Sequence, residues 1–519
     1  MLFHKLYQLL KREAPSHPPR GEENTIRMAS LPLGGAGGGL WSVWGGSILL
    51  LLSACTPHPT DVQKSEELPP IYPDYVDVTI PKNIAPLNFL VRGEVDAVEA
   101  RVKPLDRRSQ GGERQMKINA KGNELCFSLD EWRELLLDNA GKELKVTVSA
   151  RDRQTGNWTE YRSFLWHVVE DEVDPYLSYR LIEPDYEVFS HLEIRERCVE
   201  NFEERNLSTY KLVGNRCMNC HTHSVQQPNL SMMYVRGEGG GAILNENGVL
   251  RKLNIQSPTG GSVYFTFSPS GRYVCFSTNV IIPAFHARSE KRLEVYDDAS
   301  DVYVFDLQEE RVVSSALVAD SMVFETFPAF SPDGKSIYFC SAPRVSLPAQ
   351  IADLQYSLCR IGFDEHTGTF MEDVDTIVRA EGEKGSVCHP RVSPDGRYLL
   401  YTVAAYGTFP IWHRESDQRL LDLQTGHVDS LAIVNSNMSD TYHSWSSNSR
   451  WFVFASKRDD GLYGKPYFCY IDKQGKAHKP FCLPQKYPSF YDHCLKSFNV
   501  PDLGKQKMKF TAEEVGKLF

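Results

Sequence analysis

The run Cys217-Met218-Asn219-Cys220-His221 has the residue types and the spacing for covalent haem attachment. Two thiols three positions apart can add to the two vinyl groups on one edge of the porphyrin, and the adjacent imidazole can bind the iron from that side. The sequence therefore predicts one c-type haem, with Cys217 and Cys220 as its thioethers and His221 as the proximal iron ligand.

Other interpretations of the two cysteines stay open. A structural disulfide needs only the thiols, and a zinc site needs a second pair of ligands, for which Cys198 and His223 are candidates. A redox-active pair is disfavoured, because that chemistry is typical of a strand-to-helix junction in an α/β fold, whereas this chain is rich in strand patterns.

The opposite face of the iron needs a ligand from further along the chain. His223 is too few bonds from the proximal histidine to reach round the macrocycle. Met232 or Met233 can reach it, and a thioether would raise the reduction potential relative to a second imidazole, although both could instead pack beneath a strand. His389 and His443 occupy nearly equivalent positions in two repeats and are the second option, with hydrogen bonding inside the repeats as their alternative role.

The N-terminal segment indicates export. Leu40 to Leu52 is an apolar run of the length of a signal-peptide core, too short to cross a bilayer comfortably. Leu52-Ser53-Ala54-Cys55 follows and resembles the lipobox of bacterial lipoproteins. That resemblance implies that residues 1–54 are removed and that Cys55 is lipidated; an ordinary peptidase cut beside a chance cysteine is the alternative. A lipid-anchored protein of the cell envelope is expected, at the outer membrane and facing the periplasm, where cytochrome c maturation is also possible.

The charge excludes one class of partner. Lys and Arg number 57 and Asp and Glu 67, for a formal net charge of -10, and no basic block stands out. Nucleic acid is therefore not expected as a partner. The chain has twelve cysteines, of which Cys275, Cys340 and Cys469 lie in apolar runs typical of strands. These are expected to be buried free thiols rather than members of a disulfide framework.

The first domains precede the repeats. After a tether over residues 55–74, short strand patterns alternate with turns over residues 75–170 and predict a β-sandwich similar to immunoglobulin or fibronectin type III domains, with one helix at Leu129 to Asn139 capped by Asp130. Residues 171–229 are expected to be a helical linker that carries the haem motif, because Val188 to Arg205 has an amphipathic helical pattern.

An internal repeat dominates residues 230–500. Four segments of the form strand, tight turn, strand align without gaps, and they begin at Phe267, Phe330, Val392 and Trp445. With the strands between them they give about four strands per 50 to 60 residues, which is typical of a β-propeller blade. The fold class expected is mainly β, with six blades preferred and five possible, and residues 501–519 as a C-terminal tail.

The repeat Phe-Ser-Pro-Asp-Gly-Lys at Phe330 to Lys335 resembles the TolB-like propeller repeat. The resemblance implies an envelope lipoprotein with an added cytochrome c motif. Electron transfer or redox-linked binding is the function expected first, with a protein partner on the propeller face. A scaffold that binds a protein or glycan, with the cysteines structural or zinc-binding, is the alternative. The chain is expected not to be an enzyme, although a haem peroxidase is a third hypothesis.

The segment around the Cys217–His221 motif is too short to bury a haem by itself. Only about 60 residues, from Pro175 to Tyr234, surround the motif, and haem has a large apolar surface that must be buried. We therefore expect the propeller or the sandwich to complete the haem pocket.

Overall fold

The computed structural model describes residues 57–519 except 106–114, 184–190, 226, 228, 258–259, 286–292 and 381–384. The predicted signal peptide and the lipidation site Cys55 lie outside the described residues. Within the described part of the chain, no helix has both the length and the apolar character needed to cross a membrane.

The N-terminal domain has two β-sheets around one core. The larger sheet has seven strands, namely β1 (Gln63–Lys64), β3 (Val78–Pro81), β5 (Val95–Pro104), β6 (Met116–Lys121), β8 (Glu143–Asp152), β9 (Trp158–Glu160) and β10 (Phe164–Val169). The smaller sheet has three, namely β2 (Ile71–Tyr72), β4 (Phe89–Val91) and β7 (Glu124–Leu125). Alternate residues of β8 and β10 are buried, as expected for strands with one face on a core. The finer likeness to immunoglobulin or fibronectin domains stays a prediction.

The predicted helix of this domain is confirmed as α2 (Leu129–Asp138). Trp132, Leu135 and Leu136 are its buried face, at the spacing that places side chains on one side of a helix. Ser128 occupies the N-cap position, so the predicted cap at Asp130 is two residues too late. Asp130 lies in the first turn, where a carboxylate interacts favourably with the helix dipole.

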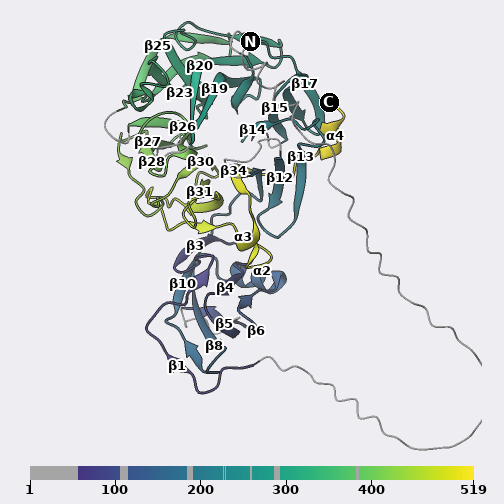
Figure 1. Ribbon diagram of the computed structural model, residues 1–519, viewed down its shortest axis with the longest axis vertical. Helices are drawn as coiled ribbons and strands as arrows, with labels where there is room; N and C mark the ends of the chain where they lie inside the picture. The colour runs from purple at the N-terminus through teal and green to yellow at the C-terminus, as the bar shows by residue number, and fades with distance from the viewer. Residues whose placement is uncertain are drawn as a thin grey trace, which may run out of the picture. The chain divides into compact units, whose positions relative to one another are not determined.

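The described residues beyond Tyr176 form six four-stranded sheets, which Figure 1 shows arranged around a common centre. Their strands, inner to outer, are as follows: β34 (Ser497–Gly504), β11 (Tyr176–Ile182), β12 (Glu193–Cys198) and β13 (Glu204–Thr209); β14 (Met218–His223), β15 (Leu230–Val235), β16 (Gly241–Glu246) and β17 (Val249–Leu253); β18 (Ser262–Phe267), β19 (Tyr273–Phe285), β20 (Leu293–Asp306) and β21 (Arg311–Val313); β22 (Val323–Phe330), β23 (Ser336–Pro343), β24 (Ser357–Asp364) and β25 (Thr369–Val378); β26 (Ser386–Val392), β27 (Tyr398–Ala404), β28 (Asp417–Asp422) and β29 (Val428–Asp429); β30 (Asp440–Trp445), β31 (Trp451–Ser456), β32 (Lys465–Tyr470) and β33 (Phe481–Cys482). We number these sheets blades 1 to 6 in that order. The mainly β fold and the preferred six-bladed propeller are confirmed.

Blade 1 closes the ring by combining the two ends of the domain. Its innermost strand, β34, comes from the C-terminal end of the chain and pairs antiparallel with β11 from the N-terminal end. Residues 501–504 therefore belong to a blade, and the predicted propeller boundary at residue 500 with a tail beyond it is wrong there. Past β34 the short helix α4 (Ala512–Gly516) begins at a capping box of Thr511 and Glu514.

The predicted helical linker is also wrong. Between Tyr176 and His223 the described residues include β11 to β14, so the propeller begins well before residue 230. The start of the predicted helix, residues 188–190, lies outside the described residues. In β12 the buried residues Ile194 and Glu196 alternate with the more exposed Glu193 and Arg195, whereas Arg197 and Cys198 at its end are both buried. Glu196 can lie on the buried face because Arg205 donates to its carboxylate at 2.7 Å. Because a glutamate occupies the buried face, the sequence of β12 lacks the alternation of apolar and polar residues typical of a strand. Its charged residues give a pattern that resembles an amphipathic helix.

The tight turns of the repeats have the expected chemistry. Gly271, Gly334 and Gly396 have φ values of 73°, 73° and 74°, and Ser449 takes the equivalent place in the last repeat with φ 61°. Only glycine adopts this left-handed conformation without steric cost. The predicted tight turns are therefore confirmed, and each places its left-handed residue just before the second strand, as in a turn followed by a bulge.

The described cysteines are all free thiols. Cys275, Cys340 and Cys469 are fully buried in blades, so their predicted role as small apolar core residues is confirmed. Cys217 and Cys220 are not bonded to each other.

We expect Gly396→Ala to lower the free energy of unfolding by about 1 kcal/mol, because an L residue is strained at this φ. An added Cβ would meet no atom within 4 Å, so the cost is backbone strain alone. Urea unfolding measures it. Gly396→Asn is the matched control and should cost less, because asparagine tolerates the left-handed region; equal losses in both variants would contradict the explanation.

Candidate functional site

Each innermost strand of the propeller has one bulge at an equivalent place. The pairing with the next strand shifts there, and one residue takes a left-handed conformation with φ between 49° and 55°. These bulge residues are Cys220, Tyr264, Phe327, His389, Tyr442 and Val500, one from each blade. A bulge adds a residue to one strand and re-aims the side chains beside it. The six bulges therefore form one layer around the centre of the ring.

The haem motif occupies the bulge of blade 2. Cys220 to Ser224 aligns without gaps with Tyr264 to Ser268 of blade 3, and the backbone N–H of each of these serines donates to the strand that follows, at 2.9 Å and 2.8 Å. The motif thus belongs to an additional propeller repeat. The sequence did not reveal this repeat because the turn residues after Ser224 are not Pro-Asp-Gly. The serine four positions after Cys220 is the one feature that could have revealed it.

Cys217, Cys220 and His221 line one cavity of about 410 Å³. The bulge shifts the alternation of β14, so that both cysteines reach the same cavity although they are three residues apart. The sequence-predicted attachment thiols and proximal histidine are therefore brought together. The lining residues span Arg180 to Asp502 and include none from the described sandwich. The pocket is completed by the propeller, as one of the two expected arrangements requires.

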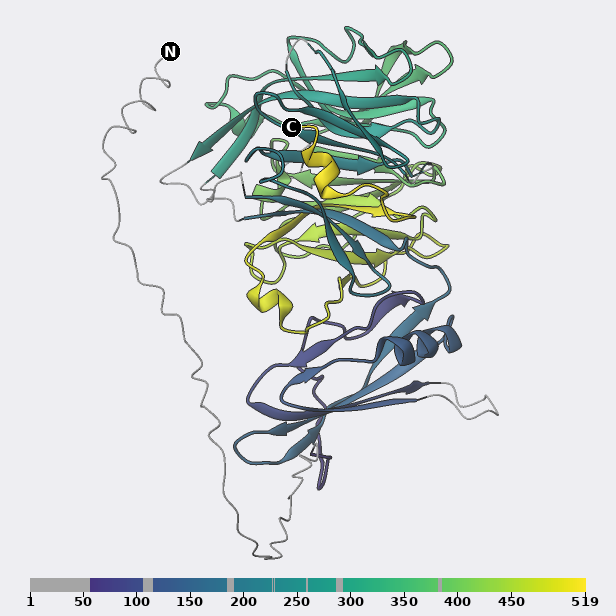
Figure 2. The same cartoon turned by 90° about the vertical axis from the view of Figure 1, so that its right-hand side faces the viewer.

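Two long connections supply apolar walls. Strands β19 and β20 have 13 and 14 residues, so their hairpin extends beyond the ordinary blade; Figure 2 shows it in teal at one side of the propeller. It contributes Ile281, Pro283 and Val295 to the cavity, and the segment between β27 and β28 contributes Phe409, Ile411 and Trp412. A large apolar cofactor could bury its surface against these side chains.

Cations outnumber anions in the cavity lining. Arg180, Arg236, Arg391 and Lys457 line it, whereas Asp502 is the one acidic lining residue among those described. Lys457 also lies over the ring of Trp412, at 5.3 Å from its centroid. The cavity therefore favours a ligand with an apolar body and negative charge.

His221 is buried without a hydrogen-bond partner. Its side chain is 4% exposed, and neither Nδ1 nor Nε2 has a partner among the described residues. Burial lowers the pKa of His221 to about 4, so its imidazole is neutral at physiological pH. A neutral imidazole has a lone pair available for a metal. Burial also raises the pKa of the Cys220 thiol, which is therefore not a reactive thiolate.

The two methionines predicted as distal ligands do not reach the cavity. Met232 packs with Phe265 and Phe276 between blades 2 and 3, and Met233 packs with Met218 between blades 1 and 2. Each is at most 4% exposed. They lie on β15, one strand further out than the motif, so they have the packing role that was their alternative.

The remaining candidate ligands fall into two groups, according to whether they line the cavity. His389 and His443 both line the cavity, whereas Cys198 and His223 do not. His223 is held by Asp502, with Nδ1 at 3.4 Å from the carboxylate, and its Nε2 lies 3.4 Å from the Ser178 hydroxyl. In the described part of the chain, no three His, Cys, Asp or Glu side chains are grouped so that they could hold a metal ion.

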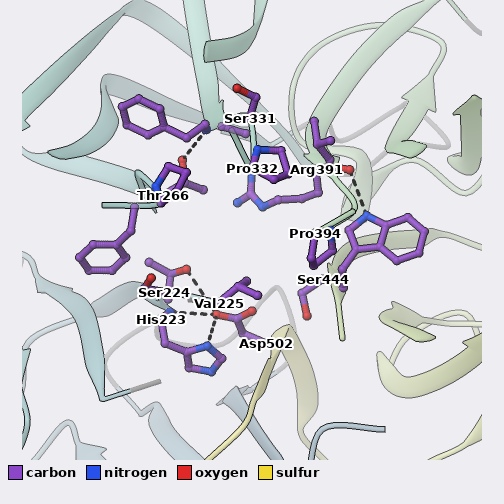
Figure 3. A pocket seen from close by; sticks show the side chains of 17 residues that line it. His223, Ser224, Val225, Thr266, Ser331, Pro332, Arg391, Pro394, Ser444 and Asp502 are labelled. Carbon is purple, nitrogen blue, oxygen red and sulfur yellow. Dashed lines mark hydrogen bonds and ion pairs between the residues drawn. The ribbon is translucent and has the colours of Figure 1, made fainter. Parts of the chain in front are cut away.

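A second, smaller cavity of about 100 Å³ adjoins the first, and Thr222, Arg391, Ser444 and Asp502 line both. Figure 3 shows His223 against Asp502 on one side of it, with Arg391 reaching in from the other. Trp445 fixes the Arg391 backbone, because its indole N–H donates to the Arg391 carbonyl at 3.1 Å. Arg391 and Asp502 thus mark the boundary between the two cavities.

Comparison with solved structures finds matches at low similarity. Puromycin hydrolase is 13% identical with a TM-score of 0.35, over 59% of this chain and 45% of its own. An oligogalacturonate lyase in complex with manganese is 12% identical with a TM-score of 0.35, over 58% and 72%. The β-propeller domain of the Trilobed protease from Pyrococcus furiosus is 9% identical with a TM-score of 0.28, over 65% and 81%. This chain thus spans less than half the length of the puromycin hydrolase.

No protein-family model matches the sequence, and no curated protein matches it. The function must therefore be argued from the propeller and its cavity, because a propeller by itself does not determine an activity.

Asp297, near the cavity lining, should make the free energy of unfolding depend on pH. It lies on β20 two residues after Val295, and Thr408 donates to its carboxyl group at 3.2 Å. Burial raises the pKa of Asp297 to about 7, above the roughly 3.9 of an unfolded chain. Between these pH values the unfolded state binds fewer protons than the folded state, so stability falls as the pH rises.

The natural protein should lose stability from pH 5 to pH 7.5, whereas Asp297→Asn should not. We therefore expect the unfolding free energy of the variant, relative to that of the natural protein, to increase by about 2 kcal/mol over this pH range. Urea unfolding at each pH measures the difference. Asp96→Asn is the control, because its hydrogen bond with Arg151 lowers the pKa of Asp96, and this variant should show no such gain. Parallel pH curves for Asp297→Asn and the natural protein would contradict the prediction.

Proposed function

We propose that this protein is an envelope lipoprotein related to TolB-like propellers, and that it carries one covalent c-type haem used for electron transfer. The observation that carries the proposal is the convergence of Cys217, Cys220 and His221 on a single, largely apolar cavity inside the ring. When bound, the haem supplies one-electron redox chemistry.

The thiols are in the state that attachment requires. Both are free and face the cavity. Each thiol would add across one vinyl double bond, with sulfur bonding to one carbon and the thiol hydrogen going to the other, so that attachment would need no net oxidation. His221 then offers an imidazole nitrogen whose buried lone pair has no other partner. An unpartnered buried polar atom costs about 1–3 kcal/mol, which metal binding would offset.

The charge of the cavity supports the same ligand. Haem has a wide apolar ring and two carboxylates, and the cavity combines apolar walls with Arg180, Arg236, Arg391 and Lys457. Nε of Arg180 has no hydrogen-bond partner among the described residues. Guanidinium groups bind carboxylates through paired hydrogen bonds, so Arg180 and Arg236 are suited to hold the propionates.

The geometry disfavours the rival roles of the cysteines. A zinc site needs its ligands to converge on one point, whereas haem attachment needs the two thiols and the imidazole spread along an edge and a centre. No converging group is present among the described residues. A redox-active pair needs a lowered thiol pKa, and burial raises that of Cys220.

The location and the partner follow from the sequence part of the proposal. Leu40 to Cys55 supports export and lipidation, and an anchored protein at the outer membrane would face the periplasm. An electron-transfer protein also needs a redox partner. We place that partner on the face of the propeller at which the β19–β20 hairpin and the segment after β27 border the cavity.

Replacing both attachment residues should abolish covalent haem. We expect Cys217→Ala/Cys220→Ala, exported together with the cytochrome c maturation machinery, to lose all haem absorbance after denaturation and acid-acetone extraction. The matched control is Cys126→Ala/Cys494→Ala, which removes two thiols away from the cavity and should keep the haem. Haem that stays attached in the first variant, or is absent from both the control and the natural protein, would refute the proposal.

A further inference from the structure

His389 is a second cavity histidine with unsatisfied nitrogens. It is the bulge residue of β26, with φ 52° and 5% exposure. Neither ring nitrogen has a hydrogen-bond partner among the described residues. Buried polar groups in folded proteins are nearly always paired, so a residue with two unpaired nitrogens facing a cavity indicates a ligand.

Aromatic side chains fix the ring of His389 in place. Its centroid lies 4.1 Å from that of Phe327, 4.6 Å from that of Tyr442 and 6.3 Å from that of Tyr264. All three are bulge residues of other blades. The imidazole is therefore oriented by packing alone, which leaves both nitrogens available to a ligand.

The order of the blades places His389 across the channel from the haem motif. Cys220 is the bulge residue of blade 2 and His389 that of blade 5, so two blades lie between them in either direction around a ring of six. His221 follows Cys220 directly and lines the same cavity as His389. A planar group attached at blade 2 and extending into the channel would have one histidine on the strand that holds it and the other opposite.

The other candidates for this position are placed differently. His443 Nε2 donates to the Leu400 carbonyl at 3.0 Å, and its Nδ1 has no hydrogen-bond partner among the described residues. His443 lies on β30 of blade 6, however, which is not the blade opposite the motif. Met232 and Met233 are packed between blades, away from the cavity. Of the sequence-predicted distal ligands, His389 has both a place in the cavity and two nitrogens without partners.

We propose that His389 is the second axial ligand of the haem iron, opposite His221. This inference rests on the proposed function, since it assumes the attached haem. With imidazoles on both faces the iron has no open position for oxygen or peroxide, so the protein transfers electrons rather than acting as a peroxidase. It also implies a lower reduction potential than methionine ligation would give.

The test uses the full-length, haem-loaded protein and three variants: His389→Ala, His389→Met and His443→Ala. The natural protein should show a low-spin optical and electron paramagnetic resonance spectrum and should not bind carbon monoxide when reduced. We expect His389→Ala to become high-spin and to bind carbon monoxide, and added imidazole to restore the low-spin spectrum. His389→Met should stay low-spin with a raised potential. His443→Ala should keep the natural spectrum.

Three results would overturn the assignment. These are a low-spin spectrum without carbon monoxide binding in His389→Ala, a loss of the low-spin spectrum in His443→Ala, or a high-spin natural protein. In each case the haem remains attached and the proposed function survives. Absence of haem from the natural protein would instead refute the proposed function itself. Rescue by imidazole separates loss of a ligand from loss of structure.

Discussion

The pairing of β34 with β11 is the constraint on which the cavity depends. Antiparallel hydrogen bonds between two strands more than 300 residues apart join the ends of the propeller into one sheet. Without this closure, blade 1 would lack its innermost strand, and Asn499, Val500 and Asp502 would be missing from the cavity lining. Asp502 would also no longer hold His223 and the backbone of β14, which carries the haem motif.

The bulges in the inner strands determine which side chains face the channel of this closed ring. A regular inner strand would present only alternate side chains to the channel, but each bulge adds a residue and places one side chain of every blade in a common layer. Four of the six bulge residues are aromatic or histidine, and the layer includes Cys220 and His389. The same kind of bulge thus provides Cys220, the proposed attachment thiol, in one blade and a buried imidazole in another.

The repeats of the propeller could be predicted from the sequence because their signal is local. A Ser-Pro-Asp-Gly turn between two apolar strands has its own conformational reason, and Gly334 and Gly396 adopt the φ that it requires. Blades 1 and 2 lack that turn, and their strands β11 to β14 were not recognised. Glu196 lies where the strand pattern calls for an apolar residue, because its partner Arg205 comes from a neighbouring strand that no local pattern reveals.

The site was partly predictable for the same reason. Cys217, Cys220 and His221 lie within five residues of sequence, so their grouping at one cavity could be predicted from their spacing, while their role in haem attachment stays a proposal. The distal ligand depends on which residues the closed ring brings across the channel. Met232 is only eleven residues from His221 yet packs between blades, while His389 is far along the chain and lines the cavity. The methionines were predicted because they are close to His221 in sequence. The order of the blades instead places His389 opposite the motif.

The most direct test of the central claim is the intact mass of the denatured, exported natural protein, followed by mapping of the modified peptide. We predict a mass increase of one haem, carried by the peptide that contains Cys217 and Cys220, together with the absorbance of a low-spin c-type haem before denaturation. An unmodified 217–221 peptide from protein that passed through a functioning maturation system would contradict the account.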